Sequence, residues 1–163
     1  AVISQLVELV TKEGKSPKTE FVGKSAKYIL DKIGITVGDD VKVILMEAKE
    51  DHPFVQVELM MPILPLVRVP DVDQAIEMAV RVEHGNRHTA MMHSRNVEKL
   101  TKMAKLIQTT IFVKNGPSYA GIGVGGEGYT TFTIAGPTGE GLTSAKSFAR
   151  RRRCVLVGGM DVR

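Results

Sequence analysis

The sequence predicts an α/β fold in which a parallel sheet carries helices on both faces. Apolar, β-branched segments alternate with helical segments between Leu64 and Lys114, in the order strand, helix, strand, helix, strand. The spacing between these strands is the length that a crossover helix needs, which favours parallel pairing and right-handed connections. The chain has 163 residues, of which 43% are hydrophobic, so it is long enough to bury a core.

The N-terminal part is expected to contain two helices. Apolar residues share one face of the first helix: Val2, Leu6, Leu9 and Val10. No capping residue precedes this helix, which suggests that the chain is a piece of a larger protein. Ser25 is the predicted N-cap of the second helix, and Gly34 is its predicted end; a polar loop over residues 14–19 separates the two.

Two strands follow these helices, over residues 41–46 and 64–69. Pro62 and Pro65 interrupt the apolar segment between Val55 and Val69, so that segment is not one central strand. We therefore expect an irregular turn over residues 58–62.

The next two helices have clear start signals, because Asp71 and Asn96 each precede an amphipathic segment. Their expected inward residues are Val72, Ile76, Met78, Ala79 and Val82 in the first, and Val97, Leu100, Met103, Ala104 and Ile107 in the second. Strands are expected over residues 88–93, 109–114, 129–134 and 154–157, with a short helix over 143–149.

The chain is organised around a glycine-rich segment, in which more than half of its sixteen glycines fall between Gly116 and Gly141. Ordering so many glycines costs backbone entropy, which a purely connecting loop rarely requires. We therefore expect something to approach the backbone closely. The segment follows the carboxyl end of a predicted parallel strand, where ligands of such sheets bind. It contains GxGxxG from Gly121 to Gly126, but the residues that follow are β-prone, which argues against a dinucleotide-binding phosphate loop.

Other motifs have simpler interpretations. The segment Gly23-Lys24-Ser25 resembles the end of a Walker A motif without its first glycine, although an anion could bind there. Three histidines lie within residues 84–93 without the spacing of zinc ligands, so no metal site is expected. Glu58 lies in an apolar turn, where it either caps backbone donors or contacts a polar ligand.

Charge and cysteine content exclude several protein classes. The net charge of +4 depends on the four arginines of residues 150–153. No aromatic residues are interleaved with them, so nucleic acid is not their expected partner. We expect them to pair with acidic groups of a neighbouring subunit or domain. Cys154 is the one cysteine, so no internal disulfide can form and a cytoplasmic location is expected. We expect Cys154 to be a small buried hydrophobic residue. No apolar run is long enough to span a membrane.

Four long segments together resemble the C-terminal part of the CoA-acylating aldehyde dehydrogenases of ethanolamine and propanediol utilisation. These segments are PFVQVELMMPILPLVRV, EHGNRHTAMMHSRN, TTIFVKNGPSYAGIGVGGEGYTTFTIAGPTGEG and TSAKSFARRRRCVL. The resemblance covers Phe21 to Val157 and implies the parallel three-layer catalytic domain of that family. It divides the chain into a partial catalytic domain over 1–149 and an oligomerisation strand with a tail over 150–163.

The resemblance implies oxidation of acetaldehyde or propionaldehyde with NAD and CoA to acyl-CoA, through a cysteine thioester. Glu58 matches the residue that contacts the nicotinamide ribose, and Met60 matches the residue beside the nicotinamide. Ile122, Val124, Gly125 and Gly126 match the lining of the aldehyde and acyl tunnel. Residues 153–157 match the strand used in homo-oligomer formation.

The resemblance also places the family's nucleophilic cysteine and its NAD-binding domain upstream of residue 1, and it matches Cys154 to a different cysteine. It implies no catalytic residue in this chain, which is therefore expected to be inactive alone. Location inside a bacterial microcompartment and contact with its shell proteins are further implications. The alternative is a non-catalytic module that binds a nucleotide, CoA or a shell partner, and an RNA-binding domain ranks last.

Overall fold

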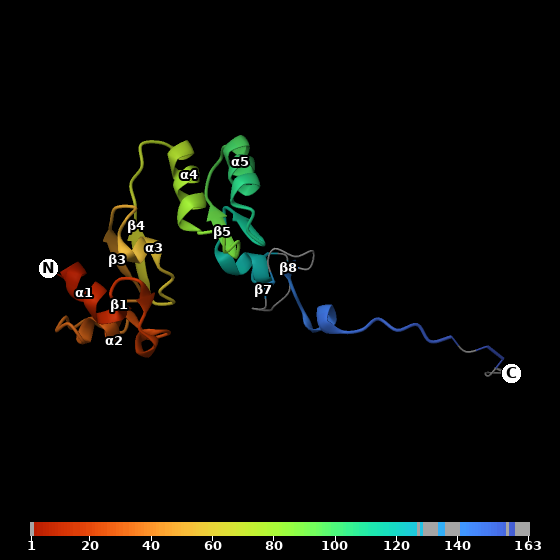
Figure 1. Cartoon of the computed structure of the whole chain (residues 1–163), viewed down its shortest axis with the longest axis horizontal. Coiled ribbons are helices and arrows are strands. Elements are labelled where there is room, and N and C mark those ends of the chain that lie inside the picture. The colour runs from red at the N-terminus through yellow and green to blue at the C-terminus, as the bar shows by residue number, and fades with distance from the viewer. Residues whose placement is uncertain (1, 127, 129–133, 136–140, 156, 159–163) are drawn as a thin grey trace. The chain divides into compact units, whose positions relative to one another are not determined.

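The computed structural model describes residues 2–126, 128, 134–135, 141–155 and 157–158. The chain divides into two compact units, Ala1–Val82 and Glu83–Arg163. Figure 1 shows the elements of both units, labelled in chain order. Each unit contains one pair of parallel strands together with helices, so the α/β prediction is confirmed.

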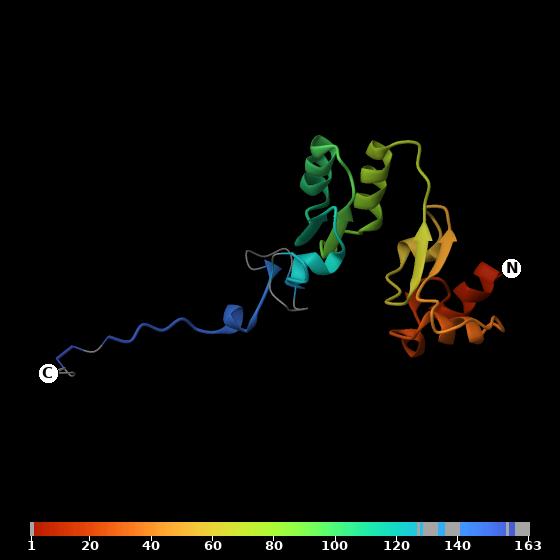
Figure 2. The same ribbon diagram turned by 180° about the vertical axis from the view of Figure 1, so that it is seen from behind.

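The first unit combines short helices with two small sheets. Its elements are α1 (Val2–Val10), β1 (Thr11–Lys12), β2 (Ser16–Pro17), the 3-10 helix η1 (Thr19–Phe21), α2 (Ala26–Asp31), β3 (Ile44–Glu47), α3 (Pro53–Gln56), β4 (Ile63–Leu66) and α4 (Val72–Val82). β1 and β2 form an antiparallel hairpin, of which β2 lies within residues 14–19, where a polar loop was predicted; α3 was also not expected. β3 and β4 lie side by side in Figures 1 and 2.

The core of this unit draws on most of its elements. The buried members are Leu6, Val10, Phe21, Ile29, Met46, Phe54, Leu59 and Ile63. The predicted inward positions Leu6 and Val10 are therefore confirmed, whereas Val2 is 44% exposed because it lies at the first turn of α1. The N-cap prediction for Ser25 is also confirmed, since its hydroxyl accepts a hydrogen bond of 3.2 Å from the Tyr28 amide.

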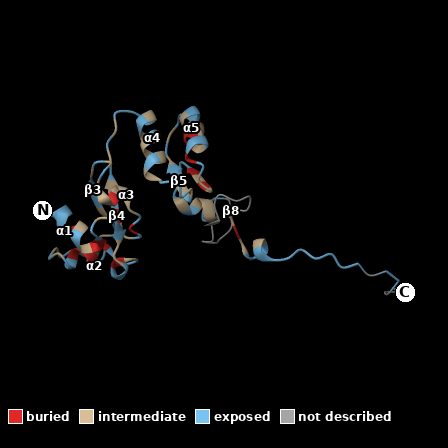
Figure 3. Cartoon of the chain, viewed as in Figure 1, coloured by how far each residue is buried: buried red, intermediate tan, exposed pale blue. Residues whose placement is uncertain are grey.

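The β3–β4 sheet has one buried and one exposed face. Ile44 pairs with Ile63 and Leu45 with Leu64 in parallel register. Met46 and Ile63 are buried in the core, while Leu45 and Leu64 are 64% and 55% exposed. This alternation follows from the two-residue period of a strand. In Figure 3 the exposed residues are pale blue and the buried ones red.

Helix α4 begins where its cap was predicted. The Asp71 carboxylate accepts a hydrogen bond of 2.9 Å from the Gln74 amide. Ile76 is buried, as expected of an inward position. Val72 is 38% exposed, so its inward assignment is wrong; it is the first residue of the helix.

The second unit is built around another parallel pair. Its elements are β5 (Thr89–Met92), α5 (Val97–Ile107), β6 (Ile111–Lys114), η2 (Ser118–Ile122), β7 (Ile134–Ala135), β8 (Gly141–Leu142) and η3 (Ala145–Phe148). Thr89 pairs with Ile111 and Met92 with Lys114, so α5 is the crossover helix of a βαβ unit. β7 and β8 pair antiparallel.

Helix α5 confirms most of its predicted pattern. The Asn96 side chain accepts a hydrogen bond of 3.0 Å from the Lys99 amide, as expected of an N-cap. Leu100, Met103 and Ile107 are buried. Val97 is 70% exposed, so its inward assignment is wrong; it is the first helical residue and lies away from the buried face.

The parallel pairing of the predicted strands is found within each unit. β3 pairs with β4 in the first unit, and β5 pairs with β6 in the second. A single sheet that continues through all of these strands stays a prediction. The strands also begin and end a few residues away from their predicted bounds, as Ile44–Glu47 shows against the expected 41–46.

The C-terminal prediction has a mixed outcome. Residues 145–148 form a short 3-10 helix with a capping box at Ser144, near the helix expected over 143–149. Residues 129–133 of the expected strand 129–134 lie outside the described residues. Of residues 154–157, the described ones are in no strand, and Cys154, Val155 and Val157 are exposed. The oligomerisation strand therefore stays a prediction.

Candidate functional site

The turn that contains Glu58 and Met60 is anchored by a buried residue between them. It follows α3, whose N-terminus is capped by the His52 ring nitrogen Nδ1, which accepts a hydrogen bond of 3.1 Å from the Phe54 amide. Leu59 is 5% exposed and belongs to the core, while Glu58 is exposed and Met60 is 57% exposed. The alternation directs the two candidate residues to solvent. The prediction of an irregular turn is confirmed.

Met60 has a strained backbone. Its φ of 54° lies in the left-handed region, which is uncommon for a residue that is not glycine, asparagine or aspartate. The Met60 carbonyl accepts a hydrogen bond of 3.1 Å from the amide of Gly23, a residue far away in sequence. Strain of this kind persists where the surroundings fix the conformation and is frequent at functional sites.

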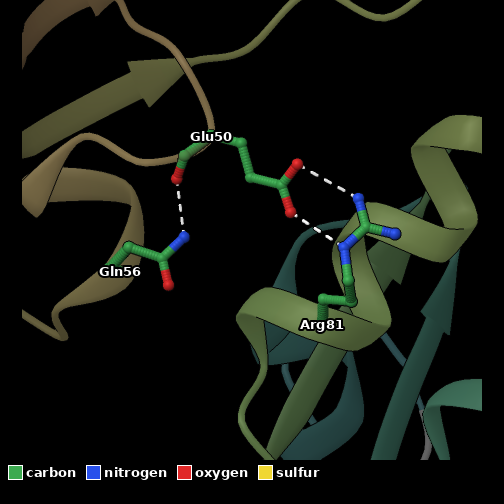
Figure 4. Close-up of polar contacts among 3 residues, drawn as sticks. All are labelled: Glu50, Gln56 and Arg81. Atoms are coloured by element: carbon green, nitrogen blue, oxygen red, sulfur yellow. Dashed lines mark hydrogen bonds and ion pairs between the residues drawn. The ribbon is translucent and has the colours of Figure 1, made fainter.

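A network of polar contacts holds the segment before this turn. The Glu50 carboxylate accepts two hydrogen bonds from the Arg81 guanidinium, of 2.9 and 3.1 Å, and the Gln56 side-chain amide donates to the Glu50 carbonyl at 2.6 Å (Figure 4). The hydrogen bond from Arg81 lowers the pKa of Glu50, and the same bond raises the pKa of Arg81. This pair links the loop after β3 to α4 within the first unit.

A hollow of about 540 Å³ adjoins the turn. Its walls come from the start of α2, the loop before β3 and the turn itself, and the lining residues are Gly23, Lys24, Ser25, Ala26, Lys27, Asp39, Val41, Lys42, Met60, Met61 and Pro62. Met60 is therefore part of a concave surface, while Glu58 is not among the residues that line it. The hollow combines basic side chains with an apolar wall.

The glycine-rich segment begins with the 3-10 helix η2. The amides of Gly123 and Val124 both donate to the Tyr119 carbonyl, which closes the end of this helix. A Cβ at Gly121 would collide with the Ile111 side chain, and a Cβ at Gly126 would lie 2.6 Å from the Ala120 carbonyl oxygen. At these two glycines the chain itself makes a close approach, and the approach of a ligand to the segment stays a prediction.

The four predicted lining residues of the second unit differ in environment. Ile122 is half-buried at the end of η2, and Val124 is 57% exposed. Gly125 has a φ of 71°, and a Cβ there would meet no atom within 4 Å, so its conformation alone favours glycine. Because Glu58 and Met60 belong to the other unit, a pocket shared by the two sets stays a prediction.

Several motif interpretations can be compared with the structure. The GxGxxG motif begins inside η2, at Gly121, whereas a dinucleotide-binding loop would follow directly after a strand. The described residues contain no group of three or more histidine, cysteine or acidic side chains able to hold a metal ion. Within the same part of the chain, no helix is long and apolar enough to cross a membrane.

Cys154 is exposed, so the expectation of a buried cysteine is wrong. It lies beside the arginines of residues 150–153, which are also exposed. A short apolar segment is buried only where another element packs on it, and sequence alone does not specify that element.

Comparison with known proteins defines the family. The aldehyde dehydrogenase family model matches residues 41–140, which is more than half of the chain. This range includes the turn with Glu58 and Met60 and the residues from Ile122 to Gly126. The chain belongs to the aldehyde dehydrogenase family.

Similar proteins in this family are CoA-acylating enzymes, as the resemblance implied. The chain is 54% identical over 152 residues to a propanal dehydrogenase (CoA-propanoylating) of Salmonella typhimurium, covering 93% of this chain and 32% of that protein. It is 50% identical over 158 residues to an acetylating acetaldehyde dehydrogenase of the same organism, covering 96% and 34%. The chain therefore spans about a third of the length of the relatives that it matches.

Solved structures agree with this assignment. A propionaldehyde dehydrogenase of Rhodopseudomonas palustris, with bound CoA and an acylated cysteine, matches with a TM-score of 0.87 and 71% identity, covering 95% of this chain and 35% of that one. A propionaldehyde dehydrogenase from the fucose utilisation microcompartment of Clostridium phytofermentans matches with a TM-score of 0.83 and 50% identity, covering 98% and 37%. The fold thus corresponds to part of an aldehyde dehydrogenase.

The hollow beside Met60 was not predicted from the sequence. Lys24 lies within the incomplete Walker A motif and Lys42 lies in no motif, yet both line the same hollow as Met60. Nothing in the linear sequence shows that these residues are close. The one related signal in the sequence is the glycine at position 23, a residue type typical of left-handed turns; its φ is 72°, and its amide donates to the Met60 carbonyl.

Proposed function

We propose that this chain is a part of a CoA-acylating aldehyde dehydrogenase that converts acetaldehyde or propionaldehyde, with NAD and CoA, into acyl-CoA and NADH. The observation that carries the proposal is the identity of 50% and 54% to two acylating enzymes over nearly the whole chain. The match of 71% to a structure that holds CoA supports the same activity. The chain contributes one part of the parallel three-layer catalytic domain, and residues 150–163 contribute the oligomerisation strand and tail.

Two side chains of the turn fit a nicotinamide cofactor. Glu58 is an exposed carboxylate able to accept hydrogen bonds from ribose hydroxyl groups, and Met60 is an exposed apolar side chain suited to a planar ring. When bound, NAD accepts the hydride and CoA accepts the acyl group. Met60 has a left-handed backbone with a φ of 54° and is one of the residues that line the hollow.

The glycine-rich segment contributes apolar lining. Ile122 and Val124 present aliphatic side chains, Gly125 has a left-handed backbone with a φ of 71°, and Gly126 has no room for a side chain beside the Ala120 carbonyl. We assign these four residues to the tunnel for the aldehyde and the acyl group. A short apolar chain fits such a lining, because it needs no hydrogen-bond partner.

The nucleophilic cysteine of the reaction is assigned to polypeptide outside this chain. Cys154 lies in an exposed irregular segment, and an activated thiolate requires a fixed setting beside a base or a helix N-terminus. The chain alone is therefore inactive. The longer enzyme is expected to form a homo-oligomer. It is also expected to lie inside a microcompartment, by analogy with the relative from the fucose utilisation microcompartment of Clostridium phytofermentans.

A chimeric enzyme tests this function. The matching third of the Rhodopseudomonas palustris enzyme is replaced by this chain, and formation of NADH and propionyl-CoA from propionaldehyde is measured. We expect activity within about tenfold of the parent, since 71% of the matched residues are identical. A Cys154→Ala chimera serves as control and should retain this activity. A folded, correctly assembled chimera without acylating activity would contradict the proposal, as would loss of activity in the control.

A further inference from the structure

Asn115 joins the carboxyl ends of the two parallel strands in the second unit. The last paired residues of these strands are Met92 of β5 and Lys114 of β6. The Asn115 amide adds a hydrogen bond of 3.0 Å to the Met92 carbonyl. Beyond this point the chain leaves β5 toward α5 and leaves β6 toward the glycine-rich segment.

The Asn115 side chain continues the pairing after the last backbone hydrogen bond. Its Oδ1 accepts a hydrogen bond of 2.8 Å from the Ser94 amide, and its Nδ2 donates one of 3.0 Å to the Ser94 carbonyl. A side-chain amide offers the same acceptor and donor as a peptide group, so one asparagine binds both backbone groups of Ser94. We refer to these two hydrogen bonds as the Asn115–Ser94 clasp.

The backbone of Asn115 restricts which residues are able to form the clasp. Its φ of 56° lies in the left-handed region, which asparagine adopts more readily than most residues with a side chain. Glycine would adopt the same backbone without the amide. Aspartate would keep an acceptor for the Ser94 amide but would place a carboxylate against the Ser94 carbonyl. Asparagine therefore combines the left-handed turn with both hydrogen bonds.

The clasp lies at the start of the glycine-rich segment. The 3-10 helix η2 begins shortly after Asn115 and lies against β6, where a Cβ at Gly121 would collide with the Ile111 side chain. Ile122 ends this helix, and Val124 follows it. The turn at Asn115 therefore sets the direction in which the chain leaves β6 toward these two residues.

We infer that Asn115 is a positioning residue, whose clasp on Ser94 holds the glycine-rich segment so that Ile122 and Val124 line the acyl tunnel. The inference deepens the proposed function and rests on it for the assignment of the tunnel. Ligands of parallel sheets bind at the carboxyl ends of the strands, which is where the clasp lies. Without the clasp, the segment occupies its competent position for only a fraction of the time, and the apparent affinity for the aldehyde falls by that fraction.

Amide hydrogen exchange of the 163-residue chain, measured by NMR, tests the clasp directly. In Asn115→Gly we expect the Ser94 amide to exchange about tenfold faster, because it loses its acceptor, and the Val124 amide of the glycine-rich segment to exchange faster with it. The Lys99 amide, which is bonded to the Asn96 side chain, should keep its original rate. Asn115→Asp retains the acceptor and should leave the Ser94 amide largely protected.

The chimeric enzyme tests the consequence for catalysis. Asn115→Gly should raise the KM for propionaldehyde about tenfold, since each lost hydrogen bond contributes a few-fold, and should change kcat by less than about twofold. A merely structural role would instead lower the amount of folded enzyme, and with it the apparent kcat, at an unchanged KM. Gln108→Gly is the matched control, because Gln108 is also left-handed, with a φ of 51° at the end of α5. It should leave both constants unchanged.

Two results would overturn the inference. They are Ser94 and Val124 amides that exchange at their original rates in Asn115→Gly, and a KM that Asn115→Gly leaves unchanged or that Gln108→Gly raises equally. A folded chimera without acylating activity would contradict the proposed function instead. The exchange measurement needs no activity, so it still decides whether the clasp holds the segment, and the two proposals fail separately.

Discussion

Replacing Ile29 by alanine is expected to destabilise the first unit strongly. Ile29 lies on α2 with 0% of its surface exposed, within the cluster that also contains Phe21 and Leu6. The substitution removes three buried carbon groups, which at about 0.8 kcal/mol each gives roughly 2.4 kcal/mol from transfer alone. The cavity left behind adds to this, so the expected loss in free energy of unfolding is about 2 to 5 kcal/mol.

Ile3→Ala removes the same atoms from a different environment and serves as the control. Ile3 lies on α1 and is 39% exposed, so part of its side chain already contacts water and no closed cavity forms. The expected loss for this variant is below about 1.5 kcal/mol. Because both variants lose the same atoms, the difference between their losses in free energy of unfolding measures the effect of burial.

Urea unfolding followed by circular dichroism measures both values. The midpoint should fall clearly for Ile29→Ala, with an unchanged slope, and only slightly for Ile3→Ala. Equal losses in the two variants, or a loss for Ile29→Ala below about 1 kcal/mol, would refute the assignment of Ile29 to a closed core.

Three further predictions follow from local geometry. Gly126→Ala places a Cβ 2.6 Å from a backbone oxygen and should destabilise the second unit by about 1 to 3 kcal/mol, whereas Val124→Ala, two residues away and exposed, should change stability by less than about 0.5 kcal/mol in the same urea assay. Asn96→Ala removes the cap of α5 and should cost about 1 kcal/mol, with Asn96→Asp largely restoring stability; equal losses would contradict the cap. The pKa of Glu50 is lowered in the folded chain, so its contribution is present above the unfolded pKa and disappears as pH falls through the folded pKa. Stability of Glu50→Gln should therefore fall less than that of the original chain during acid titration, and an identical profile would exclude the ion pair with Arg81 as a source of stability.

Features decided by a few neighbouring residues could be predicted from the sequence. The caps at Ser25 and Asn96 were predicted correctly because each cap hydrogen bond spans only three residues. The buried positions Leu6 and Leu100 followed from helical periodicity, which depends on spacing alone. The family was also evident from long ordered segments, and the family match over residues 41–140 confirms it.

Assignments that depend on packing were less successful. Cys154 and Val97 are apolar residues that the pattern placed inside, yet both are exposed, because burial requires a packed neighbour that no local pattern specifies. The pairing of β3 with β4 is a similar case, since the order of strands along a chain does not state which strands are neighbours. The predicted roles of Glu58, Met60 and the residues from Ile122 to Gly126 stay proposals.

The sequence by itself determined the family, the order of most helices and strands, and the positions of the caps, because these depend on residue identity and short-range spacing. Only the tertiary structure decided why Gly121 and Gly126 are glycines, since the atoms that exclude a Cβ belong to Ile111 and to the Ala120 carbonyl. It also decided that Lys24 faces the same hollow as Met60. Contacts between residues distant in sequence arise from packing of the whole unit, and no local pattern records them.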